Sequence, residues 1–252
     1  MTLFDYLFVD NINHLLLLGL IVFLAGIVRG CIGFAFSALV VASTSLWLDV
    51  KYTVIMVIFM EVTASLFMLK NVKDEIDYPL LKLIAIGSVF ASFFGVWVLA
   101  NIHSDWHQLL MSIYLTFVAI ISLVKFEFKK PVNNTRLFIT GIIAGFYNGL
   151  AALGGIFVAS ILTSSRYPIK NVRATMVVYF FIIEIAFFTG AYLNGLVTKE
   201  VVMTSLLLCI PMLFGIVRGS ILFSALPEVI LKQLVLFALL ILSVAGLIKV
   251  II

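Results

Sequence analysis

Charged residues are scarce in this sequence. Only 11% of its 252 residues are charged, whereas about a quarter are charged in a typical soluble domain. Hydrophobic residues make up 64% of the chain, so too little polar surface remains to cover a water-soluble globule. A bilayer accepts such a chain when helices satisfy the backbone hydrogen bonds internally. The composition therefore predicts an all-α integral membrane protein.

The side-chain patterns of metal sites and enzymes are also missing. The two cysteines, Cys31 and Cys209, form no CxxC pair and no Cys/His metal spacing. The sequence has no GxSxG, HExxH, P-loop or dinucleotide-binding pattern. We therefore expect no enzyme activity, no metal and no cofactor. The net charge of +4 comes mainly from short loops between apolar runs, which is typical of membrane topology and not of nucleic-acid binding.

What the chain does have is long apolar runs, each near or above the roughly 20 residues that a helical span needs. The first and fifth of about eight runs are the longest, and glycines interrupt both. A straight helix over residues 12–48 would be about 55 Å long, more than a bilayer core. Both long runs should therefore break, near 29–33 and 149–155, into a re-entrant hairpin or two tight crossings. The runs are 12–48, 52–69, 79–100, 109–124, 137–163, 172–193, 201–223 and 229–248.

The two broken runs also indicate an internal repeat. The segment GIVRG at 26–30 lies 119 residues before GFYNG at 145–149, and FFGV at 93–96 matches LFGI at 213–216 one residue further on. We predict a first transmembrane repeat over 1–126, a cytoplasmic linker over 127–135 and a second repeat over 136–252. Duplication combined with broken helices is a signature of secondary transporters.

The distribution of basic residues predicts an orientation. With the N-terminus outside, eleven lysines and arginines face the cytoplasm and three face outward, which obeys the positive-inside rule. This count requires an odd number of crossings in each repeat, so the two repeats should be inverted. We expect a multi-pass protein of the bacterial inner membrane. The eleven residues are Lys70, Lys73, Lys82, Lys125, Lys129, Lys130, Arg136, Arg166, Lys170, Arg173 and Lys232, and the three are Lys51, Lys199 and Lys249.

Two arginines, Arg29 and Arg218, fall inside apolar runs, and both occupy the pentapeptide GIVRG. An arginine at bilayer depth costs about 2.5–3.5 kcal/mol even on the lenient insertion scale, so it usually has a partner or a function. One interpretation is a structural pair with a buried carboxylate, and the other is an anion site. Glu61 and Glu184 are also intramembrane; they could neutralise the arginines or carry protons.

The breaks themselves predict where an anion would bind. A half-helix that starts at mid-membrane exposes free N–H groups and the positive end of its dipole. The polar residue Asn148 occupies the repeat position of Arg29 and adds a neutral donor. The predicted substrate-binding residues are Arg29, Gly30, Gly33, Ser37, Asn148, Gly154, Gly155 and Arg218.

At these residues the chain resembles the sulfite exporter TauE/SafE family of bacterial membrane proteins. The resemblance covers nearly the whole chain and rests on its size, the two repeats and the glycine-rich breaks at 26–33 and 145–155. Family members typically carry GxGGG followed by a proline. AALGG at 151–155 comes near this motif, RGCIGFAFS at 29–37 departs from it, and both lack the proline. The resemblance implies a secondary transporter of sulfite, sulfonates such as sulfoacetate, or related organic anions.

We therefore expect an alternating-access transporter that acts as an exporter. Its partners are a small anion and the lipid bilayer, and a homodimer is one possible assembly. A cation transporter that uses Glu61 and Glu184 is the main alternative. A non-transporting membrane subunit and an intramembrane enzyme are the others.

Overall fold

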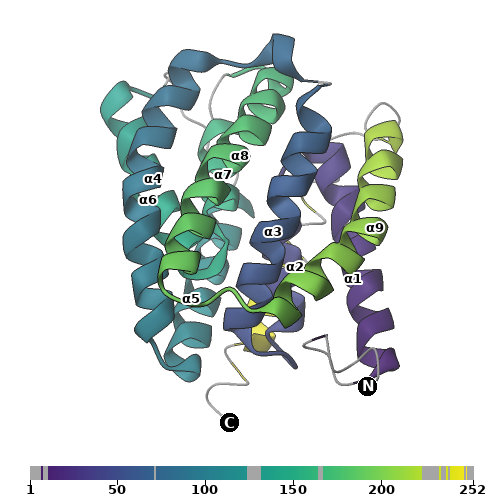
Figure 1. Ribbon diagram of the computed structural model, residues 1–252. Helices are drawn as coiled ribbons and strands as arrows, with labels where there is room; N and C mark the ends of the chain where they lie inside the picture. Colours follow the sequence, from purple (N-terminus) through teal and green to yellow (C-terminus); the bar gives the residue numbers. More distant parts are fainter. Residues whose placement is uncertain are drawn as a thin grey trace.

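Apolar helices account for nearly all of the described chain. The computed structural model describes residues 7, 11–70, 72–123, 132–163 and 167–222, together with 233, 237, 239–246 and 248. These residues form helices and no strand, which confirms the all-α prediction (Figure 1). The helices are α1 (Ile12–Ile32), α2 (Phe36–Thr44), α3 (Val50–Leu69), the 3-10 helix η2 (Lys73–Glu75), α4 (Tyr78–Asn101), α5 (Ser104–Leu123), α6 (Asn134–Ala151), α7 (Gly154–Thr163), α8 (Ile169–Leu193) and α9 (Lys199–Leu222).

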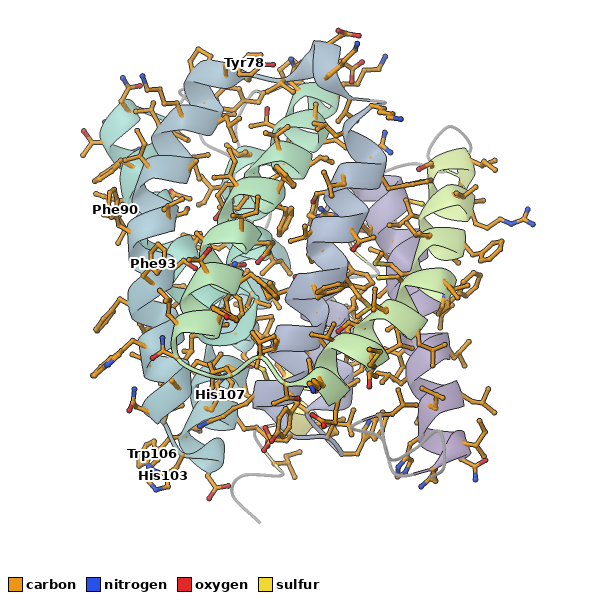
Figure 2. The ribbon with its side chains drawn as sticks, viewed as in Figure 1. Tyr78, Phe90, Phe93, His103, Trp106 and His107 are labelled. Carbon is orange, nitrogen blue, oxygen red and sulfur yellow. The ribbon has the colours of Figure 1, made fainter. Side chains whose placement is uncertain are left out.

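Five of these helices are long and apolar enough to cross a bilayer, so the chain is a multi-pass membrane protein. They are α1, α3, α4, α8 and α9, each at least 20 residues long. Along α4, the ring of Phe90 points outward and is 75% exposed, as expected for a lipid-facing side chain. Tyr78 and Trp106 are exposed near opposite ends of this helix (Figure 2). Aromatic rings at both ends fit the interfacial belts of a membrane protein.

Both long runs are broken, as predicted. The first run becomes α1 and α2, separated by residues 33–35, and α2 packs back against α1. Gly33 ends α1 in the left-handed conformation with φ 84°, which glycine adopts without strain. The second run becomes α6 and α7, and here the left-handed residue is Ala152, not one of the predicted glycines. Gly154 instead lies close to the Ala144 carbonyl of α6, where a side chain would not fit.

The helix pairs that pack most closely join the two halves of the chain. α4 packs along α6 and α1 packs along α9, on opposite sides of a centre formed by α3 and α8. In each pair, glycines bring the backbones together, because a Cβ at Gly145 would strike the Ser88 carbonyl and one at Gly215 the Phe23 carbonyl. Small residues at such spacing are the usual means of close packing between membrane helices.

Some sequence predictions lie outside the described residues. These are residues 127–131 of the linker, residues 229–232, 234–236, 238 and 247 of the last run, and the topology residues Lys125, Lys129, Lys130, Arg166, Lys232 and Lys249. The described residues of the last run, 233, 237, 239–246 and 248, are helical.

Candidate functional site

Arg29 lies at the first break and is fully buried. Its Nη2 is 3.0 Å from a carboxylate oxygen of Glu61 on α3, so the two form a buried ion pair. The guanidinium also donates to the Gly33 carbonyl at 2.8 Å and to the Ser65 hydroxyl at 3.1 Å. These contacts compensate for burial of the charge, because a buried cation without them would be strongly destabilising. Arg29 therefore ties the end of α1 to the middle of α3.

Glu61 also faces the start of α2. Ser37, in the first turn of that helix, has its backbone N–H and its hydroxyl near the Glu61 carboxylate. Ser37 and Glu61 are both buried. The first turn of a helix has N–H groups without intrahelical partners, and its dipole favours negative charge. The side chain of Glu61 therefore brings a carboxylate to the break where an anion was predicted.

A second polar pair lies at the other break. Asn148, near the end of α6, donates to Glu184 on α8 at 3.0 Å, and both side chains are fully buried. The other Glu184 oxygen has no hydrogen-bond partner among the described residues. Glu184 is within electrostatic range of Glu61 and Arg29, so the two pairs form one buried polar cluster. We name Arg29, Glu61, Ser65, Asn148 and Glu184 the central cluster.

Phe180 of α8 covers the guanidinium of Arg29. Its ring centroid lies 4.1 Å from the Arg29 Cζ, which is close enough for a cation–π interaction. Phe180 needs the absence of a side chain at Gly155 in α7, because a Cβ there would collide with the ring. Gly155, predicted as a substrate-binding residue, thus contributes by making room for the ring above Arg29.

We expect Gly155→Ala to destabilise the protein by about 1–3 kcal/mol, the usual cost of overpacking a filled core. A second substitution, Phe180→Leu, should recover much of that loss because the smaller side chain leaves space for the new methyl group. Thermal unfolding of the two single variants and the double variant in detergent measures this coupling. Additive effects of the two substitutions would contradict the packing explanation.

Of the other predicted substrate-binding residues, some contact the central cluster and others only bring helices close together. Gly33 supplies a carbonyl to Arg29, and Ser37 adjoins Glu61. Gly154 lies against Ala144 and the Cβ of Asn148, whereas Gly30 lies against Ile216 of α9. The described site residues therefore include both direct contacts of the cluster and positions that allow close helix packing.

Arg218 is not part of the central cluster. It is exposed on α9, in the last turns of that helix. The repeated pentapeptide explains this placement, because Gly26 and Gly30 of one copy pack against the α9 segment that contains Gly215 and Gly219. In both copies the glycines form the helix contact, but only the arginine of α1 turns toward α3. A long side chain near a helix end can extend its charge to the membrane interface.

Sequence reasoning missed two residues of the site, Ser65 in the central cluster and Phe180, whose ring covers Arg29. The 119-residue offset would have pointed to both, since it pairs Ser65 with Glu184 and Glu61 with Phe180. At that offset, Arg29 bonds Ser65 as Asn148 bonds Glu184. At this offset Glu184 corresponds to Ser65 and not to Glu61. The two glutamates therefore occupy repeat positions that differ by one helical turn.

Contacts between α8 and the first half of the chain hold one end of the cluster. Arg173 donates to the Gly30 carbonyl at 2.8 Å, and Asn171 donates to the Glu75 carbonyl at 3.0 Å. The backbone N–H of Asp77 donates to the Thr175 hydroxyl at 3.0 Å. These bonds fix the start of α8 against α1 and η2, next to the first break.

Within the described part of the chain, no three His, Cys, Asp or Glu residues lie close enough to hold a metal ion. The central cluster instead combines a cation, two carboxylates and the start of a short helix inside a membrane bundle. Broken helices around buried charge in a membrane bundle are typical of secondary transporters.

The match to a family model agrees with this class. The model of the sulfite exporter TauE/SafE family matches residues 18–246, which is most of the chain, so the protein belongs to this family. Membership implies a membrane transporter of sulfur anions. Among curated proteins and solved structures, none is significantly similar to the chain.

Proposed function

We propose that this protein is a secondary transporter, and an exporter, of a small sulfur oxyanion such as sulfite or a sulfonate of the sulfoacetate type. The observation that carries the proposal is the buried Arg29 at the first break, 3.0 Å from Glu61 and beside the start of α2. An arginine presents a rigid fork of donors that suits oxyanions. The substrate would bind at the central cluster, between the two breaks, and one of its two carboxylates, Glu61 or Glu184, would carry the proton.

Alternating access between two inverted repeats, 1–126 and 136–252, is part of the proposal. Its support is that the helix contacts come in matching pairs: α1 with α9 and α6 with α4, α3 with α9 and α8 with α4, α1 with α2 and α6 with α7. If each helix of one half is replaced by the corresponding helix of the other half, every contact in these pairs becomes the other contact of its pair. Such repeats can rock against each other around a central site. We further propose an inner-membrane location with the N-terminus outside, no enzyme activity, and a homodimer as the assembly.

The test is flux of labelled sulfite and sulfoacetate into proteoliposomes, with and without an imposed proton gradient. We expect saturable flux of at least one of the two anions, and a change in its rate when the gradient is collapsed. Empty liposomes provide the background. Absence of flux for both anions would overturn the proposal.

A cation transporter is the second candidate, because Glu184 is buried without a cation at ion-pair distance in the described part of the chain. In that case Arg29 would be purely structural and the two carboxylates would bind the cation. Cation flux in the same liposomes, with no anion flux, would favour this function.

A further inference from the structure

Glu61 occupies the position at which a helix N-terminus would bind an anion. α2 begins after Ala35, whose side chain provides no cap, so its first N–H groups depend on groups from other elements. The N–H and the hydroxyl of Ser37, in the first turn of α2, lie near the Glu61 carboxylate. Because free N–H groups and the helix dipole together attract anions, this carboxylate takes the place of one.

The same carboxylate is the counter-ion of Arg29. The pair is fully buried, with 3.0 Å between Nη2 and the carboxylate oxygen. Arg29 Nε and both carboxylate oxygens of Glu61 have no hydrogen-bond partner among the described residues, so Nη2 and Oε2 meet as an ion pair. The Glu61 carboxylate is therefore paired with a guanidinium and lies near the N–H and hydroxyl of Ser37, while both of its oxygens keep unused hydrogen-bonding capacity. A sulfonate group, with three oxygens and one negative charge, requires donors of the same kind.

We propose that Glu61 is a built-in competitor of the transported anion, and that protonation of Glu61 releases Arg29 and the start of α2 to bind a singly charged oxyanion. This inference rests on the proposed anion transport and adds its coupling. One proton neutralises one carboxylate while one anion enters, so the buried charge of the cluster is unchanged. The exchange avoids the large cost of an additional buried charge. Transport is then coupled one proton to one anion.

Two other described ionisable groups lie within electrostatic range of the pair. They are Glu184, which interacts with both Glu61 and Arg29, and Arg173, which interacts with Arg29. Glu184 bonds Asn148 at the second break, and Arg173 bonds the Gly30 carbonyl. Glu184 is therefore the matched control, since it is an equally buried carboxylate of the same cluster with a different hydrogen-bond partner.

The experiment is equilibrium binding of radiolabelled methanesulfonate to the purified full-length protein in nanodiscs, from about pH 5.5 to about pH 8, where this probe keeps one charge. Binding linked to uptake of one proton should weaken about tenfold for each unit of rising pH while Glu61 is ionised. Glu61→Gln should bind as tightly as the protonated wild type and lose the pH dependence. Glu184→Gln should retain it.

A measurement on the wild type alone tests the same coupling if Glu61→Gln does not fold. In weak buffer with a pH indicator, adding methanesulfonate should take up about one proton for each anion bound. Binding without proton uptake, or a Glu61→Gln protein that keeps the wild-type pH slope, would overturn the competition and leave the anion site intact. No binding of methanesulfonate by wild type or Glu61→Gln at any pH, with no flux of either sulfur anion, would overturn the proposed function as well.

Discussion

Replacing Arg29 by glutamine should reduce anion transport about 100-fold, whereas the same replacement of Arg218 should change it less than about twofold. Both arginines stand in GIVRG, but Arg29 is fully buried against Glu61 and Arg218 is exposed on α9. Charge-assisted hydrogen bonds contribute about 1.5–3 kcal/mol each, and Arg29 would offer more than one to the anion. Exposed charges contribute about 1 kcal/mol or less. Labelled-anion flux in proteoliposomes measures both variants.

A double variant separates the role of Arg29 in transport from its role in folding. Arg29→Gln alone leaves Glu61 buried without its counter-ion, which should cost about 3–5 kcal/mol of stability. Arg29→Gln with Glu61→Gln removes both charges, so thermal unfolding should return most of the way to the wild-type midpoint. Transport should stay low in the double variant. Recovery of transport together with stability would show that Arg29 only balances the charge of Glu61.

The second large effect is expected at the crossing of α4 and α6. Gly145→Ala should destabilise the protein by about 1–3 kcal/mol, because the added methyl group forces two packed backbones apart. A Cβ at Gly145 would strike the Ser88 carbonyl and would lie 2.5 Å from the Ser88 Cα. Backbone atoms cannot move aside as a flexible side chain can. Denaturation of the detergent-solubilised protein, followed by helical circular dichroism, measures the loss.

Gly19 provides the control for this substitution, because no atom lies within 4 Å of a Cβ built there. Gly19→Ala in α1 should be neutral or should stabilise the helix by about 0.4–1 kcal/mol, since alanine restricts the unfolded chain. Equal losses from Gly19→Ala and Gly145→Ala would mean that helix propensity, and not close packing, decides the result.

The broken helices could be predicted because bilayer thickness limits the length of a straight span. The run at 12–48 is too long for one crossing, and the glycines marked where it would end. The structure places the first break at residues 33–35 and the second at 152–153. The exact left-handed residue of the second break, Ala152, could not be predicted, since alanine rarely adopts that conformation.

The different roles of the two GIVRG segments could not be predicted from residue type. Both segments have the same residues in a similar apolar context, so local sequence assigns them the same role. Their difference comes from which side of each helix faces α3, and that depends on packing between α1 and α9. Predicting Arg29 and Arg218 together as one site ignored this contact.

The sequence by itself determined the membrane class, the broken runs and the buried charges at Arg29, Glu61 and Glu184, because hydropathy and charge act locally along the chain. Only the tertiary structure decided which charges meet. The pairing of Arg29 with Glu61 on α3, the cover of Phe180 and the bond between Asn148 and Glu184 each join residues more than 30 positions apart. Such contacts follow from the close packing of helices through their glycines, which brings α3 and α8 together at the centre of the bundle.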